Sequence, residues 1–208
     1  MTFKIMILSR VRIVSCFLNV SRQRSTSTKF TTMPVNVEIK AYIPDIKSLR
    51  ETAEKLSDAG CTVLKQEDTF FVTPAGRLKL RQSQGKQAQL IYYKRSDQTG
   101  PKVSNYHVSV TDDAENLKIT LGKAYGIKGT VRKTRYLYMV GQTRVHVDSV
   151  EGLGDFMELE VEMKPGQAME EGQEIANDLM TKLGIKESDL IEGAYMDLIL
   201  EKQNTNEN

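Results

Sequence analysis

Residues 154–164 read GDFMELEVEMK, and this stretch alternates strictly between apolar and mainly acidic side chains. A period of two over this length indicates a β-strand with one apolar face and one acidic face, which carries Glu158, Glu160 and Glu162. Carboxylates two residues apart lie roughly 6.6 Å apart along a strand, and two of them can share one cation. The pattern also fits a strand whose acids simply face water.

Other stretches repeat this alternation with the opposite charge. RLKLR (77–81) places Lys79 and Arg81 on one face, and VRKTRY (131–136) does the same with Lys133 and Arg135. An open sheet would leave these charges in water, whereas a closed barrel would enclose them. Because unpaired buried charges are costly, we expect an enclosed set to need a compensating polyanion with divalent cations. Bases would then hold phosphates, and carboxylates would hold the metal.

The rest of the chain supplies enough strands for such a barrel. Strands are expected at 35–43, 62–73, 76–83, 87–95, 104–111, 129–140, 143–150 and 155–163, and helices at 46–58, 112–123, 168–183 and 190–202. Asp45 is the expected N-cap of the first helix. Consecutive strands with short connections favour an antiparallel sheet, with helices in the gaps, and thus an α+β fold.

Composition narrows the class of protein. The 208 residues are 39% hydrophobic and 27% charged, which is typical of one good-sized soluble domain. The two cysteines, Cys16 and Cys61, form neither a disulfide framework nor a zinc spacing, which indicates a reducing compartment. No apolar run approaches the ~20 residues of a membrane span, so we expect no membrane partner.

The first 34 residues differ from the remainder. They hold six of the 29 basic residues and none of the acids, and they are rich in Ser and Thr. This is typical of a mitochondrial transit peptide, with a disordered leader as the alternative. If translation starts at Met33, the protein would be cytoplasmic. We therefore expect a leader at 1–34, a domain at 35–202 and a disordered tail at 203–208. The domain is net acidic and lacks an RNA-binding motif, so no nucleic-acid partner is expected.

Several spaced segments carry a family resemblance. They are Glu38-Ile39-Lys40, QEDTFF (66–71), RLKLR (77–81), IYYKR (91–95), residues 131–163 and AYMDLIL (194–200). In this order they resemble the CYTH family, which joins class IV adenylyl cyclases and thiamine triphosphatases among the triphosphate tunnel metalloenzymes. The cyclase branch is the more similar one. The resemblance implies an eight-stranded antiparallel β-barrel with helices packed outside, a triphosphate inside, and Mg²⁺ or Mn²⁺ as cofactor.

The resemblance also implies site residues. The family signature Glu-x-Glu-x-Lys reads Asn36-Val37-Glu38-Ile39-Lys40, so an amide replaces the first carboxylate and can coordinate a hard cation only without charge. The implied phosphate-binding residues are Lys40, Lys79, Arg81, Lys94, Lys133 and Arg135. The implied metal ligands are Glu38, Asp148, Glu158 and Glu160, and the implied catalytic residues are Lys40, Glu38 and Arg135. His107 is either a weak phosphate donor or a surface residue, and Arg77 and Arg144 are either site or outer-rim residues.

Three functions fit these residues. We expect metal-dependent hydrolysis of a small-molecule triphosphate, such as tripolyphosphate, thiamine triphosphate or a nucleoside triphosphate. The alternative is an adenylyl cyclase making cyclic AMP and pyrophosphate from ATP, but no residue set can be assigned to align a ribose hydroxyl for attack. A non-catalytic phosphate-binding module is the third reading, and Asn36 is its best support. The sequence does not specify which organic group the triphosphate carries. It also leaves open whether the protein forms a homodimer.

Overall fold

The computed structural model describes residues 35–95 and 102–206. The predicted leader at residues 1–34 therefore lies outside the described residues, and the mitochondrial localisation stays a prediction. Within the described ranges, no helix is both long and apolar enough to cross a membrane.

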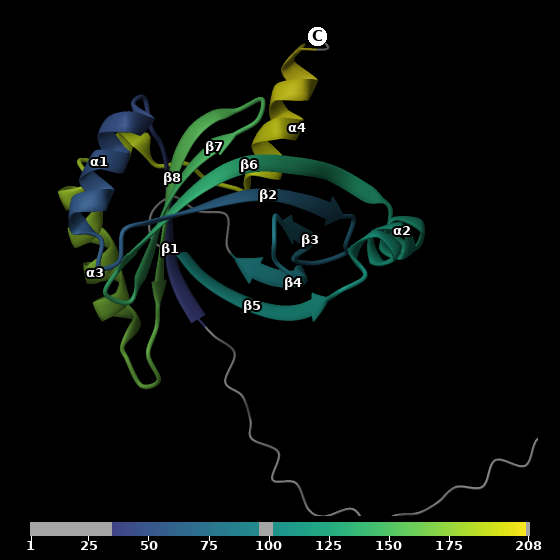
Figure 1. The fold of residues 1–208 in the computed structure, drawn as a ribbon, viewed down its shortest axis with the longest axis horizontal. Helices are drawn as coiled ribbons and strands as arrows, with labels where there is room; N and C mark the ends of the chain where they lie inside the picture. Colours follow the sequence, from purple (N-terminus) through teal and green to yellow (C-terminus); the bar gives the residue numbers. More distant parts are fainter. Residues whose placement is uncertain (1–34, 96–101, 207–208) are drawn as a thin grey trace, which may run out of the picture. The chain divides into compact units, whose positions relative to one another are not determined.

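In the described part of the chain, eight strands close into an antiparallel barrel (Figure 1). They are β1 (Val35–Tyr42), β2 (Cys61–Phe71), β3 (Arg77–Ser83), β4 (Ala88–Arg95), β5 (Lys102–Thr111), β6 (Ile127–Val140), β7 (Thr143–Val150) and β8 (Gly154–Glu162). Their order around the barrel is β1-β5-β4-β3-β2-β6-β7-β8, and β1 closes it by pairing with both β5 and β8. The expected α+β fold with an eight-stranded antiparallel barrel is confirmed.

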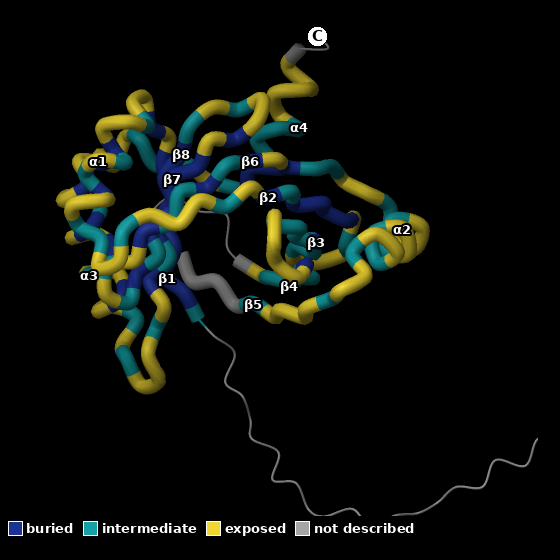
Figure 2. The backbone as a smooth tube through the Cα atoms, in the orientation of Figure 1, coloured by how far each residue is buried: buried dark blue, intermediate teal, exposed yellow. Residues whose placement is uncertain are grey.

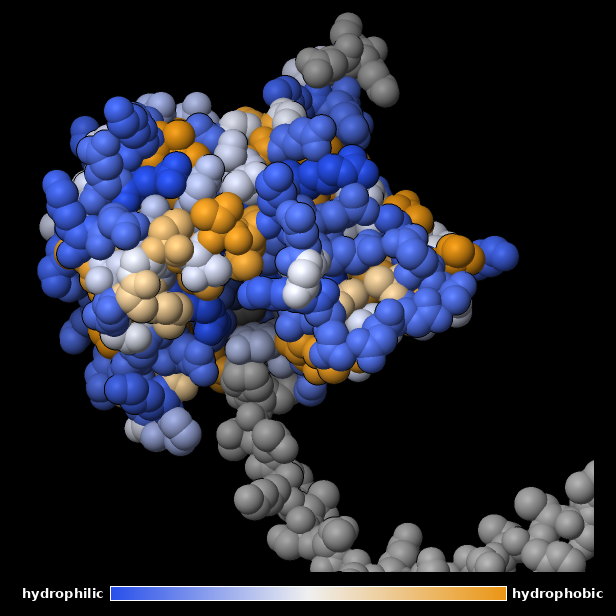
Figure 3. All heavy atoms as spheres, in the orientation of Figure 1, coloured by the Kyte–Doolittle hydropathy of each residue, from blue (hydrophilic) through white to orange (hydrophobic). Residues whose placement is uncertain are grey.

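Helices cover the outer surface of the barrel, and the apolar strand faces point toward them. Helices α1 (Ile46–Leu56) and α3 (Met169–Lys182) pack on β1, β7 and β8, where Ile39 and Leu159 meet Leu49 and Leu179. Helix α2 (Ala114–Tyr125) packs over β2 and β3. Buried segments lie along the strands beneath the helices (Figure 2), and the visible outer face is predominantly hydrophilic (Figure 3). The charged strand faces are therefore enclosed, as the closed-barrel alternative requires.

The ends of the first helix follow from local chemistry. Asp45 caps α1 as expected, because its carboxylate accepts the backbone N–H groups of Lys47 and Ser48 at 3.0 and 3.1 Å. These bonds satisfy donors that the first turn of a helix leaves unpaired. The cap thus fixes where the chain leaves β1 and starts to cover the barrel.

Helix α4 (Tyr195–Asn206) begins later and ends later than expected. Ile191 pairs with the end of β1, where its N–H donates to the Lys40 carbonyl at 3.0 Å, so this segment is extended. Gly193 then takes a φ of 75°, a left-handed conformation that favours glycine, just before the helix. The helix continues past Gln203, where we expected the tail to begin, to Asn206. Its first residues pack in an apolar cluster with Phe70 and Phe156.

Candidate active site

The barrel encloses a cavity of about 400 Å³ with two chemically different halves. Charged residues from β1, β2, β3, β6, β7 and β8 line one half, and uncharged residues from β4 and β5 line the other. The charged lining consists of Glu38, Lys40, Asp68, Lys79, Arg81, Lys133, Arg135, Arg144, Glu158 and Glu160. The uncharged half includes Ile91, Tyr93, Tyr106 and Val108. Five of the six expected phosphate-binding residues and three of the four expected metal ligands therefore share one cavity.

Lys94 does not belong to this group. Its side chain is exposed and lines a separate surface depression with Arg77 and Asp197, while Ile91 and Tyr93 of the same strand face the cavity. The expected phosphate contact is therefore corrected: alternate residues point to opposite faces, and Lys94 has the outward parity. Arg77 donates to Asp197 at 2.8 Å in that outer depression.

His107 is exposed on β5 opposite Tyr92, next to Tyr106, which faces the cavity. The structure thus favours the surface alternative for His107.

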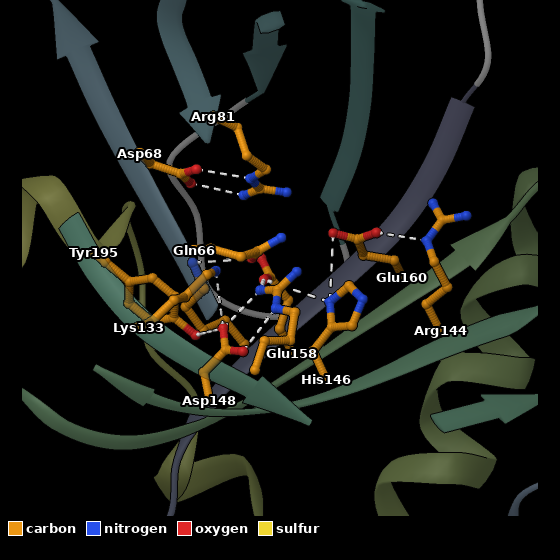
Figure 4. Close-up of polar contacts among 12 residues, drawn as sticks. Gln66, Asp68, Arg81, Lys133, Arg144, His146, Asp148, Glu158, Glu160 and Tyr195 are labelled. Carbon is orange, nitrogen blue, oxygen red and sulfur yellow. Dashed lines mark hydrogen bonds and ion pairs between the residues drawn. The ribbon is translucent and has the colours of Figure 1, made fainter. Parts of the chain in front are cut away.

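Asp148 is the second correction. It is fully buried and does not line the cavity. Its carboxylate accepts hydrogen bonds from Nε and Nη2 of Arg135 at 2.7 and 2.6 Å, from Lys133 at 3.0 Å and from the hydroxyl of Tyr195 at 3.0 Å (Figure 4). Burial would raise the pKa of Asp148, but the charges of Arg135 and Lys133 outweigh it and hold the pKa well below its ordinary value. Asp148 thus anchors two bases, and the structure does not place it with the metal-side acids.

Asp68 plays the same part on the other wall, and the sequence interpretation missed it. It lies opposite Arg81 in the β2–β3 register and accepts that guanidinium through two bonds of 2.7 Å, and Lys79 at 3.0 Å (Figure 4). Burial again acts to raise the pKa of this carboxyl, but Arg81 and Lys79 lower it well below its ordinary value. The signal was available, because the hairpin register pairs the Asp of QEDTFF with the last Arg of RLKLR. The bases are thus held in two pairs, each around a buried aspartate.

Three residues on β7 and β8 gather oxygen and nitrogen donors. His146, Glu158 and Glu160 each offer one ligand atom, and these atoms lie within 4.8 Å of one another. Glu158 also accepts Arg135 at 2.7 Å and lies 3.5 Å from the Lys40 ammonium, so it joins the acids to the bases. Burial would raise the pKa of Glu160, but neighbouring cationic groups lower it to about 2, which leaves it ionised at neutral pH.

Arg144 belongs to the cavity rather than to an outer rim. Its guanidinium donates to Glu160 at 2.9 Å and to Glu162 at 2.8 Å. In the amide orientation that satisfies both of its polar atoms, Asn36 accepts from Arg144 at 3.1 Å and donates to the carbonyl of Val35. The amide that replaces the first signature carboxylate therefore faces a cation.

Comparison with known proteins assigns the family. Residues 35–195 match the CYTH domain. This chain belongs to the CYTH family. Adenylate cyclase CyaB of Aeromonas hydrophila is 28% identical over 144 residues, which are 64% of this chain and 72% of that protein.

Solved structures agree with this assignment. The PH1012 protein of Pyrococcus horikoshii OT3 has a TM-score of 0.68 at 25% identity and covers 78% of this chain and 98% of its own. HpAC1 from Hippeastrum, for which a dominant triphosphatase activity is described, has a TM-score of 0.54 at 16% identity over 74% and 89% of the two chains. At that identity the likeness shows the fold alone.

The donor set of this CYTH protein fits a divalent cation. Glu158 and Glu160 supply hard carboxylate oxygens, which suit Mg²⁺ and Mn²⁺. His146 adds a buried ring nitrogen, Nδ1, that has no hydrogen-bond partner. Glu38 lies opposite Glu160 in the β1–β8 register and lines the same cavity. Metal dependence, which goes with the CYTH tunnel enzymes, is therefore compatible with the residues present.

Lys133 is the base whose protonation is most open to change in this CYTH cavity. Burial lowers its pKa, the charge of Arg135 lowers it further, and Asp148 offsets these effects only in part, which leaves the pKa at about 7. Its ammonium lies 5.0 Å from the centre of the Tyr195 ring. A bound phosphate would favour the charged form of Lys133.

Binding of tripolyphosphate at pH 8 should therefore take up a proton. With a pKa of about 7, free Lys133 is mostly neutral at pH 8, and anion binding raises this pKa, so Lys133 gains a proton as the complex forms. Calorimetric titrations in two buffers of different ionisation enthalpy measure the uptake. The matched control is Lys133→Arg, which stays charged, so the wild type should take up more protons on binding than this variant. Equal uptake by both proteins would contradict this assignment.

Proposed function

We propose that this CYTH protein hydrolyses a triphosphate with the help of a divalent cation. The observation that carries the proposal is the convergence of Lys40, Lys79, Arg81, Lys133 and Arg135 on one cavity, beside the donor group of His146, Glu158 and Glu160. A triphosphate carries several negative charges in a row, and a curved wall of fixed cations is complementary to them. The adjoining carboxylates complete the requirements for metal-assisted phosphoryl chemistry.

The fixed bases supply most of the expected catalysis. Arg135 is held by Asp148 and Glu158 at once, so its charge is already oriented before substrate enters. Preorganised charge of this kind stabilises the negative charge that develops on a leaving phosphate. When bound at Glu158 and Glu160, a divalent cation would polarise phosphate oxygens and lower the pKa of a water. Lys40 lies 3.5 Å from Glu158 in the same cavity, so it can contact a phosphate that a cation at Glu158 would bind.

A second candidate function has a specific observation in its favour. The uncharged half of the cavity presents Ile91, Tyr93, Tyr106 and Val108, and Val108 remains 46% exposed although it faces inward. This wall offers room and apolar contact for an organic group beside the phosphates. The Aeromonas relative is named an adenylate cyclase, so ATP cyclisation is the alternative. Fold and family do not fix the reaction.

A substrate panel separates these functions. Purified protein is incubated with tripolyphosphate, thiamine triphosphate or ATP, each with Mg²⁺ and with Mn²⁺, and the products are separated by chromatography. We expect orthophosphate as the product. If cyclic AMP forms together with an equal amount of pyrophosphate, the protein is a cyclase and the hydrolysis proposal is wrong. Binding without turnover would identify a phosphate-binding module.

Lys40→Ala should lower turnover about 100-fold or more, because the ammonium that stabilises charge on the phosphate is lost. Lys94→Ala is the matched control, since Lys94 is exposed outside the cavity, and it should change turnover less than twofold. Both are measured as steady-state kcat with the best substrate of the panel. A folded Lys40→Ala protein with near-normal kcat would remove Lys40 from the site.

A further inference from the structure

His146 belongs to the donor group with Glu158 and Glu160, yet its Nδ1 atom makes no hydrogen bond. The side chain is only 4% exposed, and in the β7–β8 register it lies directly opposite Glu158. Nδ1 is 3.9 Å from Glu158 Oε2 and 3.7 Å from Glu160 Oε1 (Figure 4). Both separations are too long for a hydrogen bond, and Nδ1 is buried without a hydrogen-bond partner. A buried polar atom without a partner is costly and calls for an explanation.

The surrounding ion pairs indicate what that explanation is. Glu158 Oε2 accepts Arg135 and Glu160 Oε2 accepts Arg144, so both acids are already held by guanidinium groups. A protonated imidazole attracted to them would close to about 2.7–2.9 Å. The observed gaps instead match the roughly 3–4 Å between ligand atoms that share one ion at about 2.1 Å. The spacing therefore leaves room for one ion shared by the three ligand atoms.

We infer that His146 supplies a nitrogen ligand to this metal centre and biases it toward first-row transition ions over Mg²⁺. Imidazole is a softer ligand than carboxylate or water and suits transition ions, whereas Mg²⁺ is bound mainly by oxygen. The sequence interpretation assigned only carboxylates to the metal, so the nitrogen ligand changes the expected ion. The inference rests on the proposed function only in placing a cation in this cavity. Its test needs metal binding and no turnover.

Electron spin-echo spectroscopy of bound Mn²⁺ tests the ligand directly. The chain has two histidines, and His107 is exposed on the outer face of β5, which makes His107→Gln the matched control. We expect nitrogen modulation in the wild-type protein and in His107→Gln, and its loss in His146→Gln. Wild-type protein made with ¹⁵N-histidine should show the isotope shift, which assigns the signal even if His146→Gln does not fold. No nitrogen coupling in the wild type, or coupling that survives in folded His146→Gln, would overturn the inference.

Calorimetric titration with Mn²⁺ and with Mg²⁺ tests the selectivity. We expect the wild type to bind Mn²⁺ at least tenfold more tightly than Mg²⁺. His146→Gln should weaken Mn²⁺ binding about 10- to 100-fold and Mg²⁺ binding less than about threefold, so the preference collapses. Equal weakening for both ions would contradict a nitrogen-based preference. Nitrogen coupling in a protein that turns over no triphosphate would leave this inference standing while the proposed function fails.

Discussion

Replacing Arg135 with methionine should abolish measurable turnover, with a loss of at least about 1,000-fold, and lower the free energy of unfolding by about 3–5 kcal/mol. The guanidinium is 3% exposed and makes three bonds of 2.6–2.7 Å to Asp148 and Glu158. Methionine fills a similar volume but leaves both carboxylates short of a cation inside the barrel. The protein is destabilised because the substitution removes one partner of a buried ion pair and leaves the other charged. Turnover falls because the variant lacks the oriented positive charge that would face the phosphates.

Arg135→Lys is the matched control for this prediction. Lysine keeps the charge but cannot reproduce the paired geometry to Asp148, so stability should recover in large part and turnover only in small part. Urea unfolding monitored by circular dichroism gives the free energy, and product formation with saturating substrate gives kcat. If Arg135→Met unfolds at the wild-type urea concentration, the buried network contributes little to stability. Wild-type kcat in that variant would place the phosphates elsewhere.

Strand periodicity predicted the number and the two faces of the strands, whereas the closed barrel was predicted only from the family resemblance. The alternation in 154–164 and in RLKLR assigned the two faces of β8 and β3 correctly, because each strand has a clear apolar side. In β6 it identified the face of Lys133 and Arg135, although the opposite face carries Arg132 and Thr134.

In β4 the run LIYY is apolar on both sides, so no parity could be chosen for Lys94. Lys94 points outward because it has the opposite parity to Ile91 and Tyr93, which face the cavity, and no local signal in the strand would have revealed this.

The ion-pair partners on neighbouring strands were harder to predict than the face of each strand that is enclosed. We expected the enclosed bases to need a bound polyanion, but Asp68 and Asp148 already neutralise part of their charge. Asp148 was assigned to metal because it matches a metal-side position of the family that the chain resembles. Its real partners are set by the β6–β7 register, which places Arg135 directly opposite. Such a partnership depends on the pairing of distinct strands, which alternation along one strand does not specify.

Asp148→Asn distinguishes the two roles of this carboxylate. The variant should bind Mn²⁺ with an affinity within about threefold of the wild type, because Asp148 does not line the cavity. Its free energy of unfolding should fall by about 3–5 kcal/mol, since Lys133 and Arg135 lose the charge that compensates them. The folded-state pKa of Asp148 is depressed, so its stabilisation is complete above the unfolded value near 4 and is lost as pH falls through the folded pKa. The variant should therefore lose stability less steeply than the wild type on acidification.

Glu160→Gln is the comparison that makes the Asp148 test decisive. Glu160 offers an oxygen to the donor group of His146, Glu158 and Glu160, so its amide variant should lose at least tenfold in Mn²⁺ affinity. It should lose less stability than Asp148→Asn, because Glu160 is less buried and the variant keeps its Arg144 contact as a neutral hydrogen bond. Calorimetric titration with Mn²⁺ and urea unfolding of both variants give the two quantities. A tenfold loss of Mn²⁺ affinity in a stable Asp148→Asn protein would return Asp148 to the metal and show that the buried anchor rearranges when the ion binds.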